Sequence, residues 1–425
     1  MAGLYIHIPF CRSRCIYCGF YSTTLPDLQD RYTEALCREM ELRMREKGKG
    51  ALSTIYLGGG TPSQLSEENL QKIFLHINKV YDTRHTAEIT MECNPDDLTD
   101  SYVAMLSQLP VNRISMGAQT FSDERLRFLR RRHTASQVTA AVERLRKAGF
   151  GNISIDLMFG FPDETLADWL QDIEAVLALR PEHVSAYSLM VEEGTELYRR
   201  LKMKDERFKS EDERLKVKLN EETERQMYEL LIDKLEAAGY EHYEISNFAL
   251  KNEEYRMKNE ESAGALRNDS SFFILHSSFK SLHNSSYWNG TPYIGIGAAA
   301  HSYDIESRQW NVSDIHKYME AVEEEYLKMS GGMECKVSLP SRGRFGGGFE
   351  LLDADTRYND LVTTALRTRE GIDLGRLEDK YRVYLLQNAR LALDNGLLHI
   401  DGNRIHLTRQ GLFVSDDVMS DLIWI

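Results

Sequence analysis

The feature that most constrains the fold of this chain is a repeated alternation of short apolar segments with longer segments of helical periodicity. The short segments are rich in β-branched and aromatic residues, and helix-length stretches such as 29–46, 67–81 and 136–148 lie between them. This alternation is typical of parallel βα units. It predicts an α/β fold in the form of an incomplete (β/α)6 barrel. The expected strands cover residues 4–9, 54–57, 88–92, 113–116, 152–157 and 183–189.

Unusual residues follow the expected strands. A cysteine-rich loop follows the first strand, and a Gly-Gly-Gly-Thr-Pro turn at 58–62 follows the second. Glu92, Gln119 and Asp156 close the third, fourth and fifth strands. Because the chemistry of (β/α) barrels gathers at the C-terminal ends of the strands, we expect these side chains to meet at one face. Either carboxylate could bind ribose hydroxyls, and either could instead cap a helix.

Three of the six cysteines stand close together in the motif Cys11-x3-Cys15-x2-Cys18. Three thiolates on one loop can bind three irons of a 4Fe–4S cluster and leave the fourth iron open to another ligand. Zinc is the alternative, but a structural zinc site needs four closed ligands, and the sequence offers no obvious fourth. The scattered Cys37 and Cys93 are expected to be small buried residues, as is Cys335.

Composition and charge argue against a nucleic-acid-binding, a membrane-spanning or a secreted protein. The chain has a formal net charge of −14, which argues against a sequence-independent grip on nucleic acid. No apolar run approaches the length of a membrane-spanning helix, and the N-terminus lacks the pattern of a secretion signal. We therefore expect a cytoplasmic protein without a nucleic-acid partner.

At 425 residues the chain exceeds what one core usually supports, so more than one domain is expected. The predicted division is a partial barrel at 1–250, an insertion and connecting region at 251–340, and a small helical domain at 341–425. The last domain contains two short strands around an Asp-Gly turn with helices on both sides, which suggests a winged-helix-like module. We expect it to cover the barrel mouth rather than bind DNA.

The cysteine motif, with Tyr17 just before its third cysteine, resembles the radical S-adenosylmethionine superfamily. That resemblance implies that S-adenosylmethionine chelates the open iron, with the GGGTP turn beside its amino group. More of the chain is similar to one branch, the oxygen-independent coproporphyrinogen III dehydrogenases and the HemW haem chaperones. The matching segments are YIHIPFC, GGGTP, ECNP, SMGAQTF, LRRRH and SIDLMFGFP.

The resemblance to this branch also implies roles for single residues. Tyr5, Gly59 and Glu92 are similar to contacts of the cluster-bound cofactor. A second set is similar to residues that hold a second S-adenosylmethionine molecule in the dehydrogenases: Tyr17, Gly60, Thr61, Gln119, Arg131 and Asp156. Arg131 lies in a run of three arginines, which would otherwise be interpreted as a solvated helix end.

Two features separate chaperone from dehydrogenase. The dehydrogenases carry a fourth cysteine where this chain has Phe20, and a long segment where only ten residues precede Cys11. The segment from His283 to Trp288 matches the HNxxYW motif of HemW proteins, in which the histidine is the proposed haem ligand. An imidazole is a usual axial ligand of haem iron, although a histidine beside aromatic residues is more often packed in a core. The insertion at 251–282 departs from the branch.

The sequence therefore favours a haem chaperone that binds haem, a 4Fe–4S cluster and S-adenosylmethionine and transfers haem to an acceptor protein. A membrane-bound cytochrome is one candidate acceptor. The alternative is an oxygen-independent coproporphyrinogen III oxidase of porphyrin biosynthesis, which works through a 5′-deoxyadenosyl radical. A zinc or redox-sensing protein without radical chemistry is the third class. No residue is assigned a catalytic role.

Overall fold

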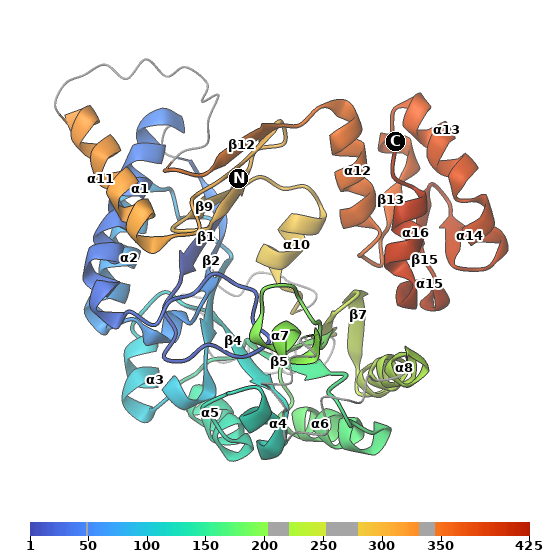
Figure 1. The fold of residues 1–425 in the computed structure, drawn as a ribbon, viewed down its shortest axis with the longest axis horizontal. Coiled ribbons are helices and arrows are strands. Elements are labelled where there is room, and N and C mark those ends of the chain that lie inside the picture. The colour runs from blue at the N-terminus through green and yellow to red at the C-terminus, as the bar shows by residue number, and fades with distance from the viewer. Residues whose placement is uncertain (48–49, 203–220, 252–278, 331–344) are drawn as a thin grey trace, which may run out of the picture.

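The computed structural model describes residues 1–47, 50–202, 221–251, 279–330 and 345–425. One large sheet dominates, with helices packed along its outer side and a separate small domain beside it (Figure 1). The order of its twelve strands is β12-β11-β10-β9-β1-β2-β3-β4-β5-β6-β8-β7. The α/β architecture that the sequence predicts is confirmed.

The six expected strands form the centre of this sheet, and neighbours in the order β1 to β6 pair in parallel. Their bounds are β1 Ala2–Ile8, β2 Leu52–Gly59, β3 Glu88–Cys93, β4 Arg113–Gln119, β5 Ile153–Phe159 and β6 His183–Ser188. Most of their residues are buried on both faces, as expected of parallel strands covered by helices.

Helices connect these strands as predicted. The three expected ones are α1 Gln29–Lys47, α2 Glu67–Val80 and α5 Ala135–Lys147, and α3 Asp100–Leu106, α4 Asp123–Phe128 and α6 Leu166–Leu179 complete the set. The side chain of Ser66 caps α2 by accepting from the Asn69 N–H. Gly149 follows α5 with φ +92°, the left-handed conformation that ends helices and favours glycine.

The sheet continues beyond both ends of the parallel set. Strand β9 Tyr293–Ile296 pairs in parallel with β1, and β10 His301–Tyr303, β11 Ser307–Trp310 and β12 Gly348–Leu351 add antiparallel strands outside it. At the other end β8 Asn247–Leu250 pairs with β6, and β7 Tyr240–Glu244 pairs with β8. The sheet thus takes in strands from both sides of residue 250, where the sequence predicts a boundary.

A buried carboxylate fixes α1 to the added strands. Glu39 is fully buried and accepts from the Gly297 N–H at 2.8 Å and from the Tyr318 hydroxyl at 2.6 Å. Arg43 pairs with it at 2.7 Å, and Asn311 Nδ2 donates to it at 3.0 Å. A buried charge is tolerated only when its partners satisfy it this completely. Glu39 therefore holds β9 and α11 Ile315–Ser330 against α1.

The C-terminal residues form a second core with its own three-stranded sheet. The predicted hairpin is present as β14 Leu398–Asp401 and β15 Arg404–Leu407, and β13 Ile372–Asp373 pairs with β15. Its helices are α12 Ala354–Ala365, α13 Asp379–Asn388, α14 Arg390–Asp394, α15 Arg409–Phe413 and α16 Ser415–Asp421.

The small domain contacts the large one through charged groups. Arg367 pairs with Glu244 at 2.9 Å, and its guanidinium lies 4.8 Å from the ring centre of Trp288. Trp288 ends α10 Leu282–Trp288, the helix that carries the HNxxYW motif. The domain is thus seated beside that motif (Figure 1).

Some sequence predictions concern residues outside the described part. These are Cys335, most of the 251–282 insertion and the centre of the charged segment that runs between α7 Glu196–Lys202 and α8 Glu221–Ala237. Cys37 and Cys93 are buried, as expected. In the part that the structure describes, none of the helices combines the length and the apolar character needed to span a bilayer.

Candidate functional site

The three clustered cysteines lie on the loop after β1, at the C-terminal end of that strand. Each is a free, partly buried thiol, and each lies within electrostatic range of the other two. Burial raises the pKa of the Cys11 thiol, and it raises that of Cys18 to about 11. The Ile16 carbonyl accepts from the Leu197 N–H at 2.8 Å, so α7 is tied to this loop.

The donor set of this loop can be compared with what a cluster requires. Within the described ranges, no group of three or more Cys, His, Asp or Glu side chains is already arranged as an ion site. Three sulfur donors on one loop, with no fourth beside them among the residues described, fit a 4Fe–4S cluster with one open iron better than a closed zinc site. Cys11, Cys15 and Cys18 are therefore the residues that could hold such a cluster.

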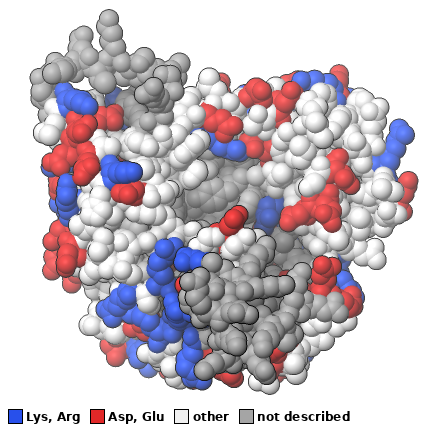
Figure 2. All heavy atoms as spheres, viewed as in Figure 1, with Lys and Arg blue, Asp and Glu red and all other residues white. Residues whose placement is uncertain are grey.

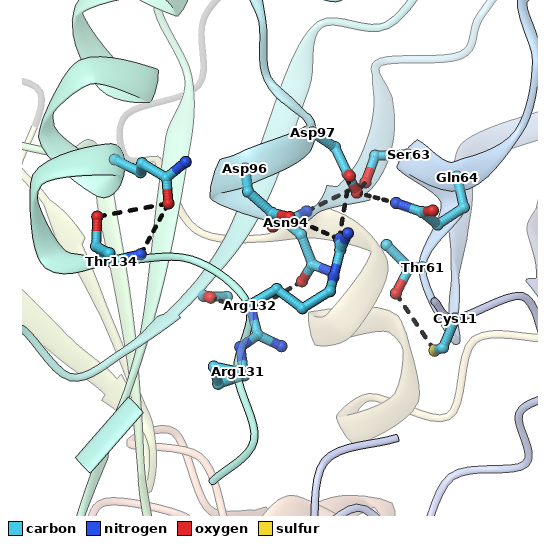
Figure 3. Close-up of polar contacts among 12 residues, drawn as sticks. Cys11, Thr61, Ser63, Gln64, Asn94, Asp96, Asp97, Arg131, Arg132 and Thr134 are labelled. Carbon is cyan, nitrogen blue, oxygen red and sulfur yellow. Dashed lines mark hydrogen bonds and ion pairs between the residues drawn. The ribbon is translucent and has the colours of Figure 1, made fainter. Parts of the chain in front are cut away.

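The GGGTP turn after β2 lies directly against the end of β1. A side chain at Gly60 would approach the carbonyl oxygen of Ile8 and the carbonyl carbon of Pro9 to 2.7 Å, and Gly59 has φ +107°. These contacts explain the two glycines by packing and backbone conformation. The close approach brings Thr61 Oγ1 to 3.4 Å from Cys11 Sγ (Figure 3).

A polar brace centred on Asp97, in the turn after β3, supports the GGGTP turn. Ser63 Oγ donates to Asp97 at 2.7 Å, Gln64 Nε2 also donates to that carboxylate, and Arg132 donates to it at 3.1 Å (Figure 3). Arg132 pairs with Asp96 as well, at 2.9 Å. Arg132 is therefore not part of a solvated helix end, because it holds the turns after β2 and β3 together.

Glu92, near the end of β3, is held by two donors from β2. The Tyr56 hydroxyl donates to Oε1 at 2.7 Å and the Gly59 N–H donates to Oε2 at 3.1 Å. Burial raises the pKa of Glu92 to about 7, with a further rise from Asp156. Burial likewise raises the pKa of Asp156 to about 6, although the hydrogen bonds from Ser185 and Ser115 lower it. Two acids that influence each other thus face one region of the barrel.

Replacing Glu92 by glutamine is expected to flatten the dependence of stability on pH. Its pKa of about 7 in the folded protein exceeds the value of about 4.3 in an unfolded chain, so the folded state binds the proton more tightly. The resulting stability is fully present below about pH 4 and is lost as the pH rises through about 7. The free energy of unfolding in urea should fall as the pH rises from 5.5 to 8.0. This fall should be smaller in Glu92→Gln than in the parent, by on the order of 2 kcal/mol.

The exposed Glu68, at the start of α2, supplies the control for this measurement. Glu68→Gln should keep the pH dependence of the parent protein. Identical slopes for Glu92→Gln and the parent would contradict the prediction.

Arg131, from the loop after α4, reaches into the same region. Its guanidinium donates to Asn94 Oδ1 at 2.8 Å, to the Gly117 carbonyl at 2.5 Å and to Cys15 Sγ at 3.8 Å. Figure 3 shows Arg131 beside Asn94, below the Asp97 brace. Its Nε is buried and has no partner. Arg131 thus uses most of its donors within the chain, and its Nε–H remains for a bound group.

Two further predicted residues border the cysteine loop and Arg131. Gln119 ends β4 with φ +68°, a conformation that is costly for a residue with a side chain and is often found at functional sites. A side chain at Gly117 would lie 2.7 Å from Gln119 Nε2 and 3.2 Å from an Arg131 nitrogen. Tyr17 packs against Leu129 and its apolar neighbours, and burial raises its pKa well above the usual range.

Tyr5 lies on β1 with its hydroxyl 3.0 Å from His7 Nδ1. Burial lowers the pKa of His7 to about 4, and its Nε2 lies 2.9 Å from the Tyr21 carbonyl oxygen. The imidazole is therefore neutral at pH 7 and donates to that carbonyl. Burial raises the pKa of Tyr5, with a further rise from Glu92, so its hydroxyl stays protonated beside the acid.

His283 lies apart from the cysteine loop, in the core against the first halves of β1 and β2. Its side chain is fully buried, Nδ1 lies 2.8 Å from Thr54 Oγ1, and Nε2 lies 2.9 Å from the Tyr287 hydroxyl. Burial lowers its pKa to about 3, so the ring is neutral. Both ring nitrogens are occupied in this conformation. Binding of iron to Nε2 would require the Tyr287 hydroxyl to move away.

The structure brings most of the predicted residues together at the C-terminal ends of β1 to β5. His283 is connected to that group through Tyr5 and Tyr56, whose rings stack on its imidazole with centres 6.5 and 5.0 Å away. Sequence reasoning missed Tyr56 and Asn94. The alternation of β2 could have identified Tyr56, because Thr54, Tyr56 and Gly58 share one face of the strand.

Two family models match this chain, one in the large domain and one in the small domain. The profile of the radical SAM superfamily matches residues 5–176, and that of the HemN C-terminal domain matches residues 352–414. The heme chaperone HemW of Lactococcus lactis is 33% identical over 425 residues, covering 99% of this chain and 96% of that protein. The heme chaperone HemW of Bacillus subtilis is also 33% identical, over 98% of both chains.

A solved structure shares the fold. The coproporphyrinogen III oxidase HemN of Escherichia coli, described as a radical SAM enzyme, superposes with a TM-score of 0.77 at 21% identity. The alignment covers 99% of this chain and 90% of the HemN chain, so both the partial barrel and the small domain take part. Together with the relatives above, this shows that the chain belongs to the HemW family of the radical SAM superfamily.

Proposed function

We propose that this protein is a haem chaperone on a radical S-adenosylmethionine scaffold, which binds haem and hands it to an acceptor protein. The observation that carries the proposal is the 33% identity to the heme chaperones of L. lactis and B. subtilis over nearly the whole chain. Phe20 supports it, since it stands where the dehydrogenases carry a further cysteine, and its side chain is 67% exposed.

The residues at the barrel mouth support a cluster and its cofactor. Cys11, Cys15 and Cys18 would hold the cluster, and Tyr5, Gly59 and Glu92 would contact the S-adenosylmethionine bound to its open iron. When bound, this pair supplies one-electron chemistry at the end of the barrel. The residues for a second cofactor molecule would be Tyr17, Gly60, Thr61, Gln119, Arg131 and Asp156. The unpartnered Arg131 Nε suits an anionic group such as the cofactor carboxylate.

His283 is the proposed axial ligand of haem. Its neutral imidazole is the form that binds iron, and Tyr287 and Trp288 offer aromatic surface to a flat macrocycle. In this proposal the Tyr287 hydroxyl leaves Nε2 when haem enters. We propose that transfer takes place in the cytoplasm and that a membrane-bound cytochrome is one acceptor. We also propose a division into parts at 1–250, 251–340 and 341–425, in which β9 to β12 from the second and third parts complete the sheet of the first.

Haem transfer and porphyrin oxidation make different predictions for the reconstituted protein. Haem-loaded protein mixed with the apo form of a membrane-bound b-type cytochrome should lose its Soret absorbance to the cytochrome. Turnover of coproporphyrinogen III should be undetectable under anaerobic conditions with a reductant. The alternative enzyme is favoured by the shared fold alone, and catalytic formation of protoporphyrinogen IX would establish it in place of the chaperone.

A further inference from the structure

Tyr56 contacts the two proposed sites at once. It lies in the middle of β2, and its side chain is 9% exposed. On one side its hydroxyl donates to Glu92 Oε1 at 2.7 Å. On the other side its ring stacks on His283, with ring centres 5.0 Å apart and planes at 25°. A single side chain therefore contacts both Glu92, the proposed contact of S-adenosylmethionine, and His283, the proposed haem ligand.

The contact with Glu92 determines how that carboxylate is oriented. The Gly59 N–H occupies Oε2, so the Tyr56 hydroxyl and this backbone group together fix the plane of the carboxylate. Gly58 leaves the necessary space, because a side chain there would lie 2.6 Å from the Tyr56 ring and 2.9 Å from Glu92 Oε1. A buried acceptor that loses its donor is left unsatisfied, which weakens the arrangement that the donor held. Loss of the Tyr56 hydroxyl alone should therefore loosen Glu92.

The contact with His283 determines where the imidazole rests. Thr54, two residues earlier on the same face of β2, is hydrogen bonded to Nδ1 at 2.8 Å. The Tyr5 ring stacks on both Tyr56 and His283, at 6.2 and 6.5 Å between ring centres. The imidazole thus rests on the rings of Tyr5 and Tyr56, which form its platform, and Tyr56 also contacts Glu92. A shift of the Tyr56 ring changes this platform directly.

We propose that Tyr56 is a positioning residue that orients Glu92 for S-adenosylmethionine and couples that site to His283. This inference rests on the proposed function in both halves, since Glu92 is the proposed contact of S-adenosylmethionine and His283 the proposed haem ligand. Occupation of the Glu92 site pulls on the Tyr56 hydroxyl, and the stacked ring transmits the displacement to the imidazole. Because such coupling is reciprocal, haem must change the affinity for S-adenosylmethionine by the same factor that S-adenosylmethionine changes the affinity for haem.

The test is Tyr56→Phe, which removes the hydroxyl and keeps the stacked ring. Equilibrium binding of S-adenosylmethionine to the cluster-reconstituted full chain, with and without haem, measures both halves of the proposal. We expect Tyr56→Phe to weaken cofactor binding about tenfold. Haem binding without cofactor, followed by the Soret band, should stay within about twofold of the parent. The effect of haem on cofactor affinity should disappear in the variant.

Tyr102→Phe is the matched control, because its hydroxyl is buried without a hydrogen-bond partner, on α3. It should bind cofactor and haem as the parent does. Equal cofactor affinity of Tyr56→Phe and Tyr102→Phe would overturn the positioning role. Haem-dependent cofactor affinity that persists in Tyr56→Phe, or that is absent from the parent, would overturn the coupling. If the parent binds no haem, the proposed chaperone function fails, whereas the loss of cofactor affinity in Tyr56→Phe would still support the orientation of Glu92.

Discussion

Changing Cys15 to alanine should reduce the iron content of the anaerobically reconstituted protein from about four per chain to none. The loop offers three sulfur donors, and a cluster with one iron already open to solvent or cofactor does not survive the loss of a second protein ligand. Arg131 would also lose the sulfur to which it donates at 3.8 Å, leaving a buried donor unsatisfied. Iron and acid-labile sulfide analysis, together with the visible absorption of the cluster, measures the effect.

Cys37→Ala is the control for that experiment. Cys37 is buried in α1 and lies outside the three-cysteine loop, so its removal should cost some stability and no iron. Stoichiometric zinc without iron in the anaerobic parent protein would contradict the cluster hypothesis. Full iron content in Cys15→Ala would exclude this cysteine as a ligand.

Changing His283 to alanine should erase or shift the Soret band of the haem-bound protein while cluster content stays intact. The imidazole lies in the core near the start of β1, whereas the cysteine loop follows the end of that strand, so the two losses separate. Tyr287→Phe makes the opposite prediction. It removes the hydroxyl that occupies Nε2 at 2.9 Å, so haem should bind at least as tightly as in the parent. Haem titration followed by absorbance gives the affinities.

Loss of a buried side chain can also unfold α10, which would change haem binding for a different reason. Two measurements distinguish this unfolding from the loss of a haem ligand. Iron content and far-ultraviolet circular dichroism should match the parent in His283→Ala. His301→Ala, which removes an exposed imidazole stacked beside Trp310, is the control for a competing ligand and should leave the Soret band unchanged. An unaltered haem spectrum in His283→Ala would show that the motif is structural.

The parallel half of the sheet could be predicted because each βα unit is local. Within one unit, the apolar run of the strand and the helical periodicity that follows it lie within a few tens of residues of each other. For α5, the periodicity and Gly149 at its end indicate the same helix. The strands β9 to β12 were not predicted. They are three or four residues long, and β9 pairs with a strand nearly three hundred residues earlier in the chain. Short strands with distant partners leave little periodicity to detect.

The candidate site shows the same division between local and distant information. The cysteine spacing predicts the donor set, since all three residues share one loop. The surroundings of His283 could not be predicted, because Thr54 and Tyr56 come from β2 and Tyr5 from β1. The sequence predicts an imidazole available to iron, while the tertiary contacts place both of its nitrogens in hydrogen bonds.

The pairing of β1 with both β2 and β9 has a consequence for how the chain is made. During synthesis, β1 leaves the ribosome before either of its partners, and β2 can join it once Gly59 has been translated. Its other side stays an unpaired strand edge until Ile296 has been translated, and such edges recruit strands of other chains. The strand that supports the cysteine loop thus gains its second neighbour only after the whole parallel set β1 to β6 has been translated.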